Sequence, residues 1–307
     1  MRAAIALGMF VFMAIATPAS TQEIEATSFH GEPLARPTLS AEAQATQERL
    51  LAEAQAALTA NPNDADAAIW VGRRLGYLGR YRDAIAAFEA GAARHPNDAR
   101  FPRHAGHRYI SIRRIDDAIS ALRRAEALMA DRPDEIEPDG MPNAASVPTS
   151  TLKGNIAYHL GLAHYLKGNF VASGRVFAGA VALSANADSA AASRYWLYLS
   201  LARAGDRDAA ALALAPVRAD WNVIENGGYH RLALCFKGEG DCAALETEAG
   251  SGANPGSTSV AYGLAAHAQI QGRSRDARAR LTTIDAAPDW ASFGHIAAEA
   301  DLARRRR

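Results

Sequence analysis

Apolar and small residues along this chain fall into short sets with the spacing of one helix face. The first clear pair of sets consists of Ile69, Val71, Gly72 and Leu75, then Ala84, Phe88, Gly91 and Ala92. The segment Leu78-Gly79-Arg80-Tyr81 supplies a turn between the sets, and Pro96 ends the second one. No run combines β-branched residues with period-two alternation. The pattern therefore predicts antiparallel helices and no strands.

The pattern returns after 34 residues. Pro62-Asn63-Asp64-Ala65 is repeated as Pro96-Asn97-Asp98-Ala99, Gly72 as Gly106, and Ala84 as Ala118. Later segments keep a related spacing, because a Tyr-x-Leu motif precedes a glycine by ten residues at Tyr158, Tyr195 and Tyr262. A helix–turn–helix unit of this length indicates a stack of repeats that share one continuous core.

Over residues 41–303 these positions resemble the tetratricopeptide repeat family, including exported bacterial members. The resemblance implies an all-α fold, an α-α superhelical solenoid of about six helix–turn–helix repeats with capping helices at both ends. We place the repeats at 65–98, 99–132, 154–187, 191–224, 225–257 and 258–291. The capping helices are expected at about 41–59 and 290–303.

The termini and one insertion divide the chain further. Residues 1–19 resemble a secretory signal, with one charge at Arg2, an apolar stretch, and small residues before a cleavage point after Ala19. We therefore expect a periplasmic or secreted protein with no integral membrane span after cleavage. A flexible lead-in is expected at 20–40, N-terminal repeats at 41–132, a Pro-rich acidic loop at 133–152, and C-terminal repeats with a capping helix at 153–307.

Composition and motifs restrict the function classes. Thirty-three basic residues balance 33 acidic ones, which gives no reason to expect a nucleic-acid partner. The chain has no GxSxG, P-loop, HExxH or GxGxxG motif. We expect no cofactor and favour a non-catalytic scaffold or adaptor over an enzyme.

The only two cysteines, Cys235 and Cys242, flank a segment that reads as a turn between two helices. An oxidising compartment permits a disulfide between them, which would join one helix–turn–helix corner. The alternative is two free thiols. Their spacing is not that of a redox CxxC motif.

The resemblance also implies a concave groove lined by the first helix of each pair. Family positions transferred to this chain give Arg73, Tyr77, Arg100, Arg103, His107, Asn155, Tyr158, Tyr165, Tyr195, Arg203, His230 and Tyr262. Arginine binds carboxylates with two parallel hydrogen bonds, and tyrosine adds rigid contact area. We therefore expect a protein or peptide partner, with an acidic segment or a C-terminal carboxylate. The tyrosines could instead pack between repeats, and the arginines could form a solvated face.

Two other functions remain open at this point. His104 and His107 lie three residues apart on one predicted helix, and His164 and His230 lie on other helices. With carboxylates from the 133–152 loop, these histidines could make a metal site or the acid–base site of a periplasmic enzyme. A self-assembling scaffold joined end to end is the third alternative.

Overall fold

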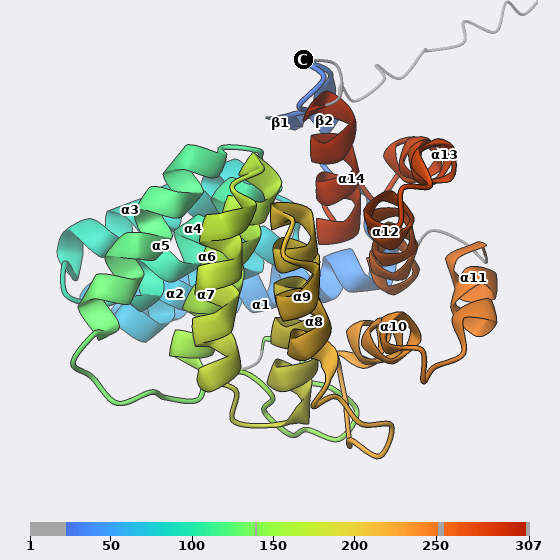
Figure 1. The fold of residues 1–307 in the computed structure, drawn as a ribbon. Helices are drawn as coiled ribbons and strands as arrows, with labels where there is room; N and C mark the ends of the chain where they lie inside the picture. The colour runs from blue at the N-terminus through green and yellow to red at the C-terminus, as the bar shows by residue number, and fades with distance from the viewer. Residues whose placement is uncertain (1–22, 139, 251–254, 305–307) are drawn as a thin grey trace, which may run out of the picture.

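The computed structural model describes residues 23–138, 140–250 and 255–304, and these residues are mostly helical (Figure 1). The helices are α1 (Ala41–Ala60), α2 (Ala65–Tyr77), α3 (Tyr81–Arg94), α4 (Arg100–Ser111), α5 (Ile115–Met129), α6 (Leu152–Lys167), α7 (Phe170–Ala182), α8 (Ala187–Ala204), α9 (Arg207–Leu214), α10 (Gly227–Lys237), α11 (Cys242–Gly250), α12 (Pro255–Ile270), α13 (Ser274–Asp285) and α14 (Phe293–Arg304).

The helices form two layers. Each even-numbered helix from α2 to α14 packs against the next even-numbered one, so these helices make the inner layer. Helices α3, α5, α7, α9, α11 and α13 each pack behind an inner helix. This arrangement is an α-α superhelix of six helix pairs with α1 and α14 at its ends, which confirms the predicted fold class.

The 34-residue period has a packing cause. A Cβ atom added to Gly72 on α2 would lie 2.4 Å from the ring of Phe88 on α3, which is closer than any real contact. A Cβ atom at Gly106 would meet Leu122 in the same way. Phe88 and Leu122 are fully buried, so each glycine admits the side chain that joins the two helices of its pair.

The turn inside each pair uses a left-handed backbone residue. Glycine takes this position in five pairs, at Gly79, Gly168, Gly205, Gly238 and Gly272. The second pair has Arg113 instead, with a φ of 66°. A side chain is unfavourable in this conformation. Arg113 keeps it because its guanidinium donates to the buried Glu299 on α14, with Nη2 2.6 Å from Oε2.

The superhelix closes on itself. Helix α14 packs against α12 and α13 and also reaches α6, far earlier in the chain (Figure 1). Arg304 of α14 donates to the Leu166 carbonyl at the end of α6. The inner layer therefore surrounds a hollow instead of lining an open groove.

The lead-in contains two strands, so the prediction of no strands is wrong there. Strands β1 (Ile24–Thr27) and β2 (Pro33–Ala35) pair antiparallel. Their sequence has no alternation long enough to signal a strand. Long-range contacts hold them, since Trp290 Nε1 donates to the Ala35 carbonyl at 2.9 Å and Arg82 Nε donates to the Glu25 carbonyl at 2.9 Å.

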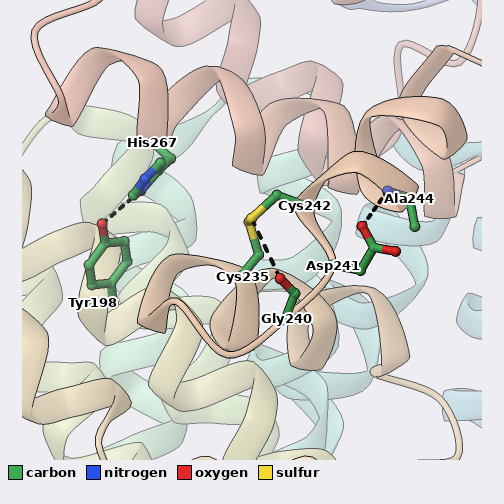
Figure 2. Close-up of a disulfide and its surroundings, with 7 residues drawn as sticks. All are labelled: Tyr198, Cys235, Gly240, Asp241, Cys242, Ala244 and His267. Atoms are coloured by element: carbon green, nitrogen blue, oxygen red, sulfur yellow. Dashed lines mark hydrogen bonds between the residues drawn. A yellow bond between two sulfur atoms is a disulfide. The ribbon is translucent and has the colours of Figure 1, made fainter.

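Cys235 and Cys242 form a disulfide, which confirms the predicted pairing (Figure 2). Their Cα atoms are 5.2 Å apart, and the bond joins the end of α10 to the start of α11. The turn between them contains Gly238 with a φ of 85°. The disulfide thus joins the two helices of the fifth and shortest pair.

The secretory signal expected at 1–19 lies outside the described residues. Within the described part of the chain, none of the helices combines the length and apolar character that crossing a bilayer requires.

Candidate functional site

All twelve residues predicted for the groove lie on inner helices. Helices α2 and α4 carry five of them, α6 carries three, and α8, α10 and α12 carry the other four. The positions transferred from the repeat pattern therefore predict correctly which helices form the inner layer. What the side chains contact on that face differs between the two halves of the molecule.

In the C-terminal half, Arg203 is at the centre of a closed polar cluster. Its Nη1 lies 2.7 Å from Asp301 Oδ2 on α14 and donates to the Tyr165 and Tyr262 hydroxyls at 2.9 and 3.2 Å. Burial alone would raise the pKa of Asp301, but the charge and hydrogen bond of Arg203 outweigh it and hold that pKa below its usual value. Arg203, Tyr165 and Tyr262 are thus fully engaged inside the protein.

Other predicted groove residues also have internal partners. The Tyr158 hydroxyl lies 3.2 Å from the Tyr229 hydroxyl, and the Tyr195 ring stacks on the Tyr229 ring at 4.8 Å. His230 Nε2 lies 2.8 Å from the Arg218 carbonyl. Arg100 binds Asp98, with Nη2 2.6 Å from Oδ2, and also reaches Asp66.

The inserted loop places a carboxylate on the inner face of the N-terminal half. Glu137 is buried, with its Oε2 2.9 Å from Arg103 Nε and its Oε1 3.4 Å from His104 Nε2. Asn155 Nδ2 donates to Glu137 Oε2 at 3.0 Å. A bridge between Ile136 and Thr151 holds the base of the loop beside α6. The loop therefore lines the hollow, and its carboxylate binds residues predicted to bind an acidic ligand.

Beside Glu137, two arginines have no carboxylate partner among the described residues. Arg73 donates to the Pro138 carbonyl at 2.7 Å and to the Tyr77 hydroxyl at 3.1 Å. Arg108 contacts His107 Nε2, and its guanidinium lies 5.3 Å from the centre of the Tyr81 ring. This face therefore carries more positive than negative charge.

Burial and the neighbouring arginines both shift the pKa values of Arg108 and His107. Burial lowers the pKa of Arg108, and the charges of Arg103 and Arg73 lower it further. Burial also lowers the pKa of His107 well below its ordinary value, and Arg108 adds to the effect. The His107 imidazole is therefore neutral. An anion placed here would relieve the repulsion among the guanidinium groups.

Two cavities meet at His107. The smaller, of about 110 Å³, is lined by Arg73, Tyr77, Arg103, Arg108 and Glu137 among others. The larger, of about 860 Å³, lies between residues 33–38, Tyr81 and residues 288–293. His107 lines both. A polar cationic recess thus adjoins a wider chamber with aromatic walls.

A third cavity, of about 330 Å³, borders α6 and the end of the inserted loop. It is lined by Asn155, Tyr158 and His159, and it shares Phe293 with the large cavity. Predicted groove residues therefore line cavities on both sides of Phe293.

The histidines proposed as metal ligands do not lie in one cluster. The His107 ring stands 4.4 Å from the His159 ring, and His104 Nδ1 lies 3.0 Å from Arg103 Nη1. His164 Nε2 faces Arg123 at 3.4 Å, and His230 is held at Arg218. Among the described residues, the ligand atoms that do gather belong to Asp285, His295 and Glu299.

Several residues of the site were not predicted. Arg108 falls outside the family groove positions, although it directly follows His107. The sequence places Tyr81 in the turn of the first repeat, and Trp290 and Phe293 in the C-terminal capping helix. The residues of the cap reach the hollow only because the superhelix closes, and no local pattern in the sequence carries that information.

Comparisons with known proteins give little beyond the fold. No family model matches the chain, and no curated protein matches it either. A solved structure of YrrB, described as a TPR protein with an unusual peptide-binding site, is similar over 83% of this chain and 98% of its own. The two share 17% sequence identity with a TM-score of 0.43. So weak a similarity says nothing about binding.

Proposed function

We propose that this chain is an exported, non-catalytic solenoid that binds a peptide segment of a partner protein inside its hollow. The segment carries an acidic side chain or a free C-terminal carboxylate. The observation that carries the proposal is the cationic recess of Arg73, Arg103 and Arg108, in which Glu137 is the carboxylate found among the described residues.

The large cavity supports the same function. Tyr81 and Trp290 meet edge to face at 5.7 Å and form one wall with Phe293 nearby. Aromatic walls with a few convergent polar groups are typical of binding pockets. A peptide carboxylate at Arg108 would place the preceding side chains near this chamber, because His107 lines both cavities.

Glu137 is an internal example of the recognition we propose. Its carboxylate is bound by an arginine and an asparagine on two inner helices, at 2.9 and 3.0 Å. Charge-assisted hydrogen bonds of this kind are among the strongest in proteins. Because the helices are already packed, little ordering would be needed when a second carboxylate binds.

The test uses short peptides of matched sequence that end in Glu-Phe, with either a free or an amidated C-terminus. Isothermal titration calorimetry against the full chain should show binding of the free acid and at least about ten-fold weaker binding of the amide. Arg108→Gln should abolish this preference. Arg80→Gln on the outer α2–α3 turn is the matched control and should retain it.

Equal binding of acid and amide to the native chain would contradict the carboxylate assignment. A preference for the acid that survives Arg108→Gln would place the contact elsewhere.

A further inference from the structure

Five ionisable side chains meet where the N-terminal segment crosses the last two helices. His30 follows β1, Asp285 ends α13, Asp289 lies in the next loop, and His295 and Glu299 lie one turn apart on α14. We call these five residues the junction cluster. They lie outside the cationic recess, and the inference drawn from them is independent of the proposed function.

His295 lies beyond hydrogen-bond distance of Asp285 and Glu299, a spacing that suits a shared ion, whereas His30 Nε2 already lies 3.3 Å from Asp285 Oδ2. His295 Nε2 lies 3.9 Å from Asp285 Oδ1 and 4.0 Å from Glu299 Oε2, and these ligand atoms are all within 4.8 Å of one another. A point between the three atoms is about 2.3 to 2.5 Å from each, slightly beyond the 2.0 to 2.2 Å of zinc–ligand bonds. A small inward movement of the side chains would form those bonds.

The cluster also concentrates unsatisfied polar atoms. Asp289 Oδ1 and His295 Nδ1 are buried without a hydrogen-bond partner, and His30 Nε2 makes an ion-pair contact with Asp285 but no hydrogen bond. They are three of the seven such side-chain atoms found among the described residues. Buried polar groups are normally paired, so a concentration of unpaired ones indicates a missing partner.

The charges of the cluster do not balance. Asp285, Asp289 and Glu299 supply three carboxylates, and among the described residues the arginine or lysine that pairs with them is Arg113, whose Nη2 lies 2.6 Å from Glu299. A divalent cation would compensate the remaining charge.

We propose that the junction cluster binds one divalent transition-metal ion, with Zn²⁺ the best fit. His295, Asp285 and Glu299 are the ligands, and His30 and Asp289 stand beside them to complete or orient the coordination. Mixed imidazole and carboxylate donors favour zinc over the all-oxygen sites of magnesium and calcium. Asp289 also lines the large cavity, which gives the ion a route of entry.

Such an ion would join the N-terminal segment to the C-terminal helix. Phe29 already donates its backbone N–H to Glu299 on α14, and the adjacent His30 pairs with Asp285 at the end of α13. The metal would therefore strengthen the closure of the superhelix, and its removal would weaken that closure.

The test uses the full chain purified without a polyhistidine tag, stripped with EDTA and dialysed. Calorimetric titration with Zn²⁺ should give one equivalent per chain, and bound zinc should raise the thermal midpoint. Co²⁺ should give the visible absorption of a low-symmetry site with a nitrogen ligand. His295→Gln and Asp285→Asn should each weaken Zn²⁺ binding by about ten-fold or more.

His230→Gln is the matched control, because this buried histidine binds a carbonyl away from the cluster and should leave zinc affinity unchanged. Asp285→Asn keeps the test valid if His295→Gln misfolds, since Asp285 is partly exposed and the change preserves its shape. Less than about 0.1 equivalent of zinc, or Asp285→Asn binding as tightly as the native chain, would show an ion-pair cluster only and overturn the proposal.

Discussion

Two arginines on the inner face, one in each half of the molecule, have different roles. In the C-terminal half, Arg203 is buried against Asp301 and two tyrosine hydroxyls. In the N-terminal half, Arg108 borders a cavity and has no carboxylate partner among the described residues. Arg203 stabilises the structure because α14 covers it. Arg108 can bind a ligand because a cavity remains beside it. Coverage by a distant helix, not the repeat pattern, separates the two roles.

Removing the covered arginine should have the largest effect on stability. Arg203→Met would leave the buried Asp301 carboxylate with Arg304 as its remaining cationic partner. We therefore expect the free energy of unfolding to fall by about 3 kcal/mol. Urea denaturation measures the change. Arg80→Met, which breaks an exposed pair with Asp83, is the control and should cost less than about 0.5 kcal/mol.

The double variant Arg203→Met/Asp301→Leu should recover most of the loss, because no charge is then left unpaired. A loss below about 1 kcal/mol for the single variant would contradict the contrast between the two halves.

The disulfide should have the next largest effect, and it belongs only to the C-terminal half. Replacing Cys235 and Cys242 by serine opens a loop with a sequence separation of 7. The chain-entropy relation predicts a loss of roughly 2 to 3 kcal/mol. Hydrogen exchange should show the loss concentrated in α10 and α11, and uniform loss across the N-terminal repeats would be the contrary result.

Lowering the pH should reduce stability by a smaller amount, and gradually, through the protonation of His267. His267 stacks on Phe236 at 4.1 Å and lies 2.8 Å from the Tyr198 hydroxyl, and burial lowers its pKa to about 4 (Figure 2). Below pH 6.5 the unfolded chain takes up a proton here that the folded chain does not hold until about pH 4. Stability should therefore fall as the pH drops through this window.

For His267 alone the loss between pH 7 and 5.5 should be about 0.5 to 1 kcal/mol, because its part-exposed ring is screened by solvent. Urea denaturation at several pH values measures it. His267→Gln should flatten the dependence by that amount, and an unchanged slope would remove His267 as a contributor.

Arg108→Gln should have the smallest effect on stability. The variant removes a desolvated cation that has no carboxylate partner, so we expect a change within about 0.5 kcal/mol of zero, or a slight gain. The same urea series measures it beside Arg203→Met. A loss as large as that of Arg203→Met would show that Arg108 is also structural and would remove the contrast.

Much of the fold could be predicted because its causes are local and repeated. Gly72 and Phe88 lie within one repeat, and their equivalents recur with the period. The disulfide could be predicted for the same reason, since its two cysteines flank one turn. The inner face could be located, but its contacts could not. Arg113 and Glu299 are 186 residues apart, and the sequence around either residue does not indicate the other as its partner.

The short hairpin at 24–35 escaped prediction for the related reason that its partners, Trp290 and Arg82, lie far away in the sequence. The metal hypothesis could not anticipate contacts between residues far apart in the sequence either. The histidines proposed from the sequence lie on α4, α6 and α10, whereas the junction cluster takes its residues from position 30 and from 285–299.

The contact between Phe29 and Glu299 has a consequence for how the molecule comes apart. Repeat arrays usually fray from whichever end is less stable, one unit after another. Here the segment between β1 and β2 and the helix α14 hold each other, so neither end of the superhelix is free to peel away. Denaturation should then approach a single cooperative step, and the chain should tolerate new termini in an outer turn if its natural ends are linked.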